Sequence, residues 1–78
     1  MDNKRAMKRI IGTVIVEKGK CFIKMENGNL VELKDEDFIE VRNGNEFHRI
    51  KFEVLINTKS GEGNPAFSGM DCQAKITR

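Results

Sequence analysis

Turn signals recur at short and nearly equal intervals along this chain. Lys18-Gly19-Lys20, Asn27-Gly28, Lys34-Asp35-Glu36-Asp37 and Asn43-Gly44 are centred near residues 19, 28, 36 and 44, so only 8–9 residues separate one turn from the next. This spacing leaves room for short strands but not for the helical crossovers that join parallel strands. The turns therefore predict a meander of antiparallel strands.

Most segments between these turns have the composition or the periodicity of strands. Residues 10–16 are dominated by β-branched side chains, which favour a pleated surface over a helix. Residues 21–26 and 70–77 alternate apolar and polar side chains, which is the period of a strand with one buried face. Shorter strands are predicted at 30–33 and 38–42.

The two Asn-Gly pairs predict tight hairpins. A type I′ turn needs positive φ at both central residues, which Asn tolerates and Gly adopts freely. We therefore expect such a turn at Asn27-Gly28 and another at Asn43-Gly44.

The longest predicted strand covers residues 47–57. Its alternation defines two faces. One face carries His48, Ile50, Phe52, Val54 and Ile56, and the other carries Phe47, Arg49, Lys51 and Glu53. Residues 58–69 contain glycines and an Asn-Pro pair, and they are expected to form a long loop.

The chain has 78 residues, which allows one small domain. Five or six strands in this length bury enough apolar surface only by curling into a barrel or a bent sheet. We expect an all-β fold, a small curled antiparallel meander forming an SH3-like barrel over residues 10–78, with a partly open OB-like barrel as the alternative. Residues 1–9 are polar and basic, and they are expected to form a flexible N-terminal arm.

A nearly neutral total hides an uneven distribution of charge. The 14 Lys and Arg exceed the 12 Asp and Glu by only two. Residues 1–24 are nevertheless basic, with a net charge of +5, whereas residues 25–53 have a net charge of −4 and residues 54–78 one of +1. The chain therefore lacks the uniformly cationic composition typical of strong duplex binding.

The cysteine content and the lack of long apolar segments predict a cytoplasmic protein. Two cysteines, Cys21 and Cys72, are too few for a disulfide framework. Both are expected on inward strand faces, where thiols act as small apolar side chains. No stretch approaches the ~18 apolar residues of a membrane span, and the N-terminal segment lacks the apolar core of a signal peptide. We therefore expect no association with a membrane.

No group of residues has the pattern of a catalytic or metal site. The single histidine, His48, lies on an apolar strand face and is expected at the edge of the core, without an orienting partner. One histidine and two cysteines without C-x-x-C or H-x-x-x-H spacing do not form a zinc motif. The adjacent carboxylates of Asp35, Glu36 and Asp37 are expected to be solvated on a turn and to point apart. We expect no enzyme activity, no cofactor, no metal and no small-molecule substrate.

Cationic and aromatic side chains alternate on the polar faces of two predicted strands. Such a surface binds single-stranded nucleic acid, because rings stack on bases and cations contact phosphates. Together with the basic arm, the candidate nucleic-acid-binding residues are Lys4, Arg5, Lys8, Arg9, Lys20, Phe22, Lys24, Phe47, Arg49 and Lys51. In a chain with five phenylalanines and neither Trp nor Tyr, the same rings are also needed for packing.

The second half of the chain carries an ordered series of structural motifs. A short strand, Phe38-Ile39-Glu40-Val41, precedes a glycine turn at Asn43-Gly44, and Phe47 then leads into Arg49-Ile50-Lys51-Phe52-Glu53. Gly69 enters the final alternating strand over residues 70–76. Over about 40 residues this series resembles a family of small uncharacterised β domains of phages and conjugative elements in Gram-positive bacteria. Such domains often carry Trp where this chain has Phe47. The resemblance implies an accessory protein of a mobile element, and it implies no mechanism.

The preferred functional interpretation is a non-catalytic interaction module. We expect it to dock a protein partner, or a second copy of itself, through an outer sheet face or an exposed edge strand. The alternative is a module for single-stranded nucleic acid that uses the ten residues named above. Burial of both Phe22 and Phe47 would remove the stacking platform that this alternative needs.

Overall fold

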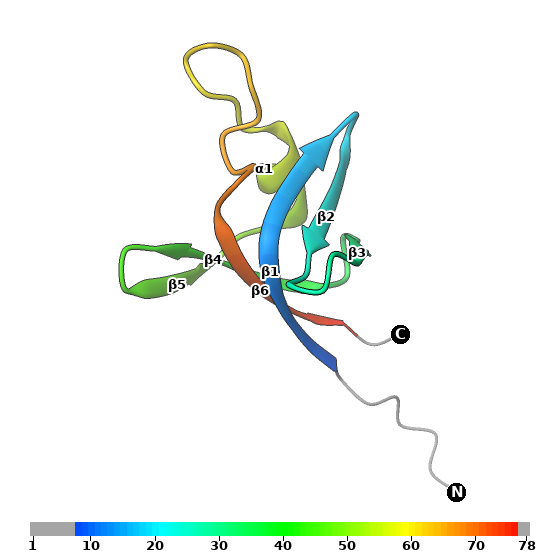
Figure 1. The fold of residues 1–78 in the computed structure, drawn as a ribbon. Helices are drawn as coiled ribbons and strands as arrows, with labels where there is room; N and C mark the ends of the chain where they lie inside the picture. The colour runs from blue at the N-terminus through cyan, green and yellow to red at the C-terminus, as the bar shows by residue number, and fades with distance from the viewer. Residues whose placement is uncertain (1–7, 77–78) are drawn as a thin grey trace, which may run out of the picture.

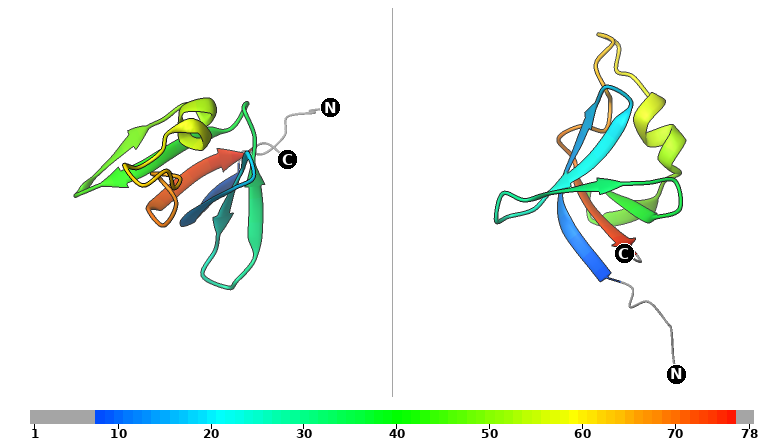
Figure 2. Two further views of the ribbon diagram at one scale, coloured as in Figure 1. Left: turned by 90° about the horizontal axis from the view of Figure 1, so that it is seen from above. Right: turned by 90° about the vertical axis from the view of Figure 1, so that its right-hand side faces the viewer.

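The computed structural model describes residues 8–76 of the chain. Six strands and one short helix make up this part (Figures 1 and 2). In chain order they are β1 (Lys8–Glu17), β2 (Lys20–Lys24), β3 (Leu30–Leu33), β4 (Phe38–Asn43), β5 (Glu46–Arg49), α1 (Phe52–Asn57) and β6 (Asp71–Ile76). The all-β class and the antiparallel pairing predicted from the sequence are confirmed.

The six strands form one sheet in the order β3-β2-β1-β6-β4-β5. The first three strands are a meander and β4–β5 is a hairpin, but β4 pairs with β6 and not with β3. The predicted simple meander is therefore wrong at one step, where residues 34–37 carry the chain from β3 at one edge to β4 beyond β6. Within residues 8–76 no ladder joins the two edge strands, β3 and β5. The sheet is thus open, and neither predicted barrel is confirmed.

The open sheet curls over a small apolar core on one of its faces. The view from above in Figure 2 shows the β2–β3 and β4–β5 hairpins diverging from the central strands, with α1 beside the sheet. The core consists of alternate strand residues together with one helix residue. They are Ile10, Val14, Val16, Cys21, Ile23, Leu33, Ile39, Val41, Leu55, Cys72, Ala74 and Ile76. The predicted inward faces of the strands at 21–26 and 70–77 supply Cys21, Ile23, Cys72, Ala74 and Ile76 of this set.

The predicted long strand at 47–57 is confirmed over residues 47–49, which belong to β5, and is wrong beyond them, because residues 52–57 form α1. Leu55 is fully buried while Phe52 and Ile56 pack against the core, so an i, i+3, i+4 spacing faces the sheet. Glu53 lies in the first turn, where a negative charge is favourable. Thr58 ends the helix, because its hydroxyl and its backbone N–H both donate to the Val54 carbonyl oxygen. Packing of this apolar stripe overrides the β propensity of the segment.

The type I′ turn does not lie at either Asn-Gly pair. Among the described non-glycine residues only Lys18 has a positive φ, and Lys18-Gly19, with φ of 51° and 76°, joins β1 to β2 as a type I′ turn. Gly28 (φ 91°) is instead the last residue of a four-residue turn, closed by its N–H donating to the Met25 carbonyl oxygen. Gly44 (φ 68°) is the first residue of a two-residue loop, as in type II′ turns. Both predicted hairpins are present, with different turn geometry.

Gly12 precedes Thr13, the residue of β1 that pairs with both neighbouring strands. Residues 8–13 pair with β6, and residues 13–17 pair with β2. A Cβ atom at Gly12 would overlap the Lys24 carbonyl oxygen and would lie 2.6 Å from the Ile23 Cγ2 atom. The close approach of the two backbones therefore depends on the missing side chain.

We predict that Gly12→Ala lowers the free energy of unfolding by at least about 2 kcal/mol, because the methyl group must displace the β2 backbone. Urea unfolding followed by far-UV circular dichroism measures this change. Gly61→Ala is the matched control, since a Cβ atom added there would meet nothing within 4 Å, and its effect should stay within about 0.5 kcal/mol. Equal stability of the two variants would contradict the prediction.

Candidate functional site

The register of the strands places many polar and several apolar side chains on the sheet face opposite the core, which we call the outer face. Directly paired residues project to the same face. Lys24 is opposite Thr13, and Phe22 is opposite Ile15. Beyond β6, Arg42 is opposite Phe47. The outer face thus runs from β3 to β5 without interruption.

An open groove of about 790 Å³ lies on the outer face, and its lining comes from β1, β2, β4, β5, β6 and the turn after β2. We call it the outer groove. Its lining residues are Ile11, Gly12, Thr13, Lys24, Met25, Glu26, Arg42, Phe47, Asp71 and Cys72. Ile11 is 55% exposed and Phe47 is 39% exposed, so the groove presents two large apolar side chains to solvent. Exposed apolar surface in a concave site marks a binding surface.

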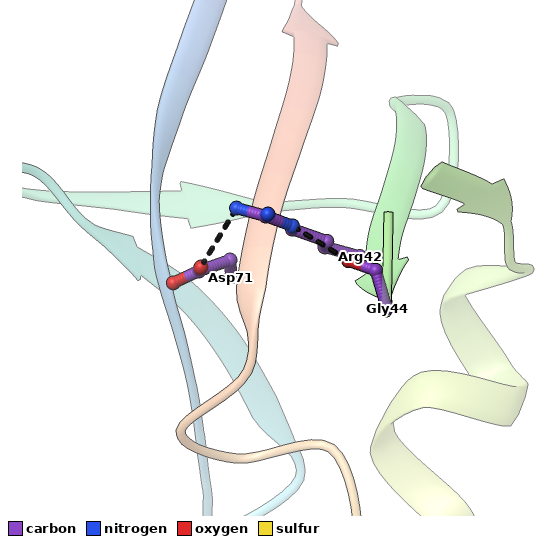
Figure 3. Close-up of polar contacts among 3 residues, drawn as sticks. All are labelled: Arg42, Gly44 and Asp71. Carbon is purple, nitrogen blue, oxygen red and sulfur yellow. Dashed lines mark hydrogen bonds and ion pairs between the residues drawn. The ribbon is translucent and has the colours of Figure 1, made fainter. Parts of the chain in front are cut away.

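Arg42 is the best-positioned polar group in this groove. Figure 3 shows its side chain reaching from β4 across β6 toward Asp71. Its Nε–H donates to the Gly44 carbonyl oxygen at 2.9 Å, and its Nη1 atom lies 3.7 Å from Asp71 Oδ2. The ion pair is long, and the Arg42 side chain is 49% exposed. The guanidinium is therefore held in place with donors left to bind a further acceptor.

The charges that line the groove balance. Lys24 and Arg42 are cationic, whereas Glu26 and Asp71 are anionic. A trough that follows a phosphate backbone is positively charged along its length. The outer groove instead offers separated charges of both signs beside apolar surface, which suits a segment of mixed polarity.

The structure brings part of the predicted nucleic-acid platform together. Lys20, Phe22 and Lys24 on β2 and Phe47 and Arg49 on β5 all lie on the outer face, as their register shows. The strands β1, β6 and β4 separate the two sets, a span of roughly 19 Å along a sheet. Only Lys24 and Phe47 share the outer groove.

The other predicted platform residues are placed differently. Lys51 lies off the sheet at the start of α1. Lys8 and Arg9, predicted in the arm, belong to β1 and pair with Ile76 and Lys75. Lys4 and Arg5 lie outside the described residues.

Several outer-face cations have partners within the sheet. The Arg9 Nη2 group donates to Gln73 Oε1 at 2.6 Å, and Gln73 Nε2 donates to Glu40 Oε1 at 2.7 Å, which joins β1, β6 and β4. The Arg49 guanidinium lies 4.5 Å from the centroid of the Phe38 ring, and Lys75 Nζ lies 5.5 Å from it. These cation–π contacts hold Arg49 on β4.

Sequence reasoning missed Arg42 and Ile11. Phe38, Glu40 and Arg42 alternate with Ile39 and Val41, so the periodicity of the 38–42 strand already placed Arg42 on a polar face. The sequence does not show that β6, which supplies Asp71, lies beside β4. Without this pairing, no pattern in the sequence places Arg42 in a site.

The predicted position of His48 at the edge of the core is wrong. Its side chain is 58% exposed, and its Nε2 atom lies 3.5 Å from Glu46 Oε1. The expectation of three solvated carboxylates also fails at Asp37, which is buried and whose Oδ2 atom accepts the Lys34 backbone N–H at 2.7 Å.

Between residues 8 and 76 no group of three or more His, Cys, Asp and Glu side chains is arranged to hold a metal ion. Nor is any helix in this range long and apolar enough to cross a membrane.

Cys21 and Cys72 are free, buried thiols, as their inward positions predict. Burial raises the pKa of each from 9.0 to about 12. Proximity of Cys21 and of Glu40 adds to the shift in the pKa of Cys72. Neither thiol is therefore a nucleophile near neutral pH.

We predict that stability falls as the pH rises from about 9 to about 12, the interval between the ordinary and the folded pKa of these thiols. The unfolded chain releases the thiol protons in this interval, whereas the folded chain retains them, so alkali favours unfolding. Urea unfolding at a series of pH values measures the slope. The variant Cys21→Ala/Cys72→Ala should show a shallower slope, because the remaining dependence comes from other groups. Identical slopes would contradict the prediction.

Comparison of the chain with protein-family models, with curated proteins and with solved structures found no match.

Proposed function

We propose that this protein is a non-catalytic interaction module whose outer groove binds an extended segment of a partner protein. The observation that carries the proposal is the groove itself, with exposed Ile11 and Phe47 beside the positioned guanidinium of Arg42. A partner segment with one apolar anchor and one carboxylate fits these groups. Arg42 receives the carboxylate, and the apolar side chain covers Ile11 and Phe47.

The chemistry of the groove favours binding over catalysis. Its one thiol, Cys72, is buried, and burial raises its pKa to about 12, so this thiol stays protonated near neutral pH. The cytoplasmic location and the role as an accessory protein of a mobile element complete the proposal. They rest on the cysteine content and on the resemblance of residues 38–76. We also propose that the curl of this open sheet is like that of an SH3-like barrel.

A random-peptide display library selected on the immobilised protein tests the groove. We expect enriched peptides that combine an acidic residue with a large apolar one. A synthetic peptide of that sequence should lose at least about tenfold in affinity with Phe47→Ala and with Arg42→Gln, because each variant removes one anchor. Isothermal titration calorimetry measures both losses.

Two exposed residues away from the groove lining provide matched controls. Val54→Ala removes an apolar side chain that is 43% exposed on α1, and Lys59→Gln removes a cation from the 58–69 loop. Neither should change the affinity. A library without an enriched sequence, or peptides that bind the groove variants as tightly as the natural chain, would refute the proposal.

Binding of single-stranded nucleic acid is the second candidate function. One observation favours it: Phe22 is half-buried and Phe47 is 39% exposed, so neither ring is removed from the surface by packing. The cations Lys20 and Lys24 flank Phe22 on the same face of β2. Their arrangement supports stacking of a base with phosphates on either side.

Fluorescence anisotropy with a labelled oligothymidylate at low salt tests this second function. Binding should weaken steeply as salt is added, and Lys20→Gln/Lys24→Gln should reduce both the affinity and the salt slope, because two phosphate contacts are lost. Lys59→Gln again serves as the control. Binding that is independent of salt, or no binding at low salt, would exclude this function.

A further inference from the structure

Strand β5 is exposed along its whole length. It ends the strand order, and all four of its residues, Glu46–Arg49, are exposed. Figure 1 shows the β4–β5 hairpin standing out from the body of the domain. The strand contains no Pro, no Lys and no bulge that would protect the edge from pairing with another strand.

The register identifies which backbone groups of β5 point away from β4. The Ile50 N–H donates to the Ile39 carbonyl oxygen at 3.0 Å, so this opposed pair is hydrogen-bonded. Hydrogen-bonded and non-hydrogen-bonded pairs alternate in antiparallel ladders. His48 and Glu46 therefore bond to β4, whereas the N–H and C=O groups of Phe47 and Arg49 face outward.

We propose that two copies of this chain associate by antiparallel pairing of their β5 strands, with Phe47 of each copy opposite the partner's Arg49. A two-fold axis perpendicular to the sheet relates the strands. In this register both outward residues of each strand exchange hydrogen bonds, which gives four backbone bonds. The result is one continuous sheet across both copies. This pairing uses the free edge of β5, and Phe47 is the one residue of the outer groove lining that belongs to this strand.

The side chains fit the same register. On the outer face, each Phe47 ring lies opposite the partner's Arg49, and an aromatic ring beside a guanidinium is a favourable cross-strand pair. Registers centred on Phe47 or on Arg49 form only one pair between outward residues within the strands, so they form fewer hydrogen bonds.

The core-side face of the β4–β5 hairpin also contributes apolar surface to the proposed dimer interface. His48, Ile50, Phe67 and Met70 line part of a shallow hollow of about 250 Å³ next to β5. The axis passes beside His48, so pairing brings the hollows of the two copies together and covers part of their apolar lining. Four residues per strand make a small interface, so the dimer is weak and depends on concentration.

Disulfide trapping reads the register directly. In the proposed dimer His48 lies opposite the partner's His48 as a non-hydrogen-bonded pair, with Cα atoms ~4.5 Å apart, a separation that a disulfide accepts. His48→Cys should therefore yield a covalent dimer on mild oxidation. Phe47→Cys and Glu46→Cys are matched controls on the same strand, and their partner cysteines lie too far apart. Dimer formation at either control in place of His48→Cys would overturn the register, and no dimer at any position would overturn the pairing.

Sedimentation velocity over about a hundredfold range of concentration tests the association without a cross-link. The natural chain should shift from monomer toward dimer. Arg49→Pro should remain monomeric, because it removes an outward N–H without breaking a bond to β4. Leu30→Pro makes the corresponding change on the other edge strand, β3, and should still dimerise. Loss of the dimer with Leu30→Pro but not with Arg49→Pro would overturn the proposal.

The two proposals fail separately. His48 is not part of the outer groove lining, so His48→Cys leaves the proposed peptide site intact. Trapping of the dimer without any peptide binding would leave the self-association standing and refute the groove function.

Discussion

The pairing of β1 with β6 through its first half and with β2 through its second half is the constraint on which the rest of the structure depends. Thr13 pairs with both strands, and at Gly12, next to it, the β1 backbone passes against the β2 backbone without an intervening side chain. The β2–β3 and β4–β5 hairpins diverge on either side of the central strands (Figure 2), and this divergence encloses the core on one face of the sheet and hollows the other. Gly12 and Thr13 are themselves part of the groove lining. The packing of the domain and the shape of its candidate site therefore share one origin.

The strands could be predicted because period-two alternation and turn residues act locally. The strand at 30–33 has the predicted bounds, and the inward faces of β2 and β6 are as expected. The prediction of a long strand is wrong because its alternation excludes Leu55 from the apolar face, whereas Leu55 is fully buried and the spacing of Phe52, Leu55 and Ile56 is that of a helix. The order of the strands depends on long-range pairing of β6, and no local pattern encodes such pairing.

The candidate site shows the same division. The face on which a strand residue lies follows from its sequence, so the predicted polar faces of Phe22, Lys24, Phe47 and Arg49 are confirmed. The pairing of the strands puts these faces on one side of a single sheet. Which of them meet depends on curvature and strand order, so only Lys24 and Phe47 share the groove. The position of Arg42 depends on its ion pair with Asp71, a residue distant in sequence. Local sequence patterns do not predict this contact.

The insertion of β6 between β1 and β4 also bears on how the domain is made. Of the six strands, β6 is the last to be synthesised, yet it occupies an interior position and pairs with both neighbours. Until residues 71–76 leave the ribosome, β1 and β4 each present an unpaired edge, and the β4–β5 hairpin has no ladder to the rest of the chain. A nascent chain at this stage is exposed to aggregation. The fold is therefore complete only when this single short strand joins the β1–β3 meander to the β4–β5 hairpin.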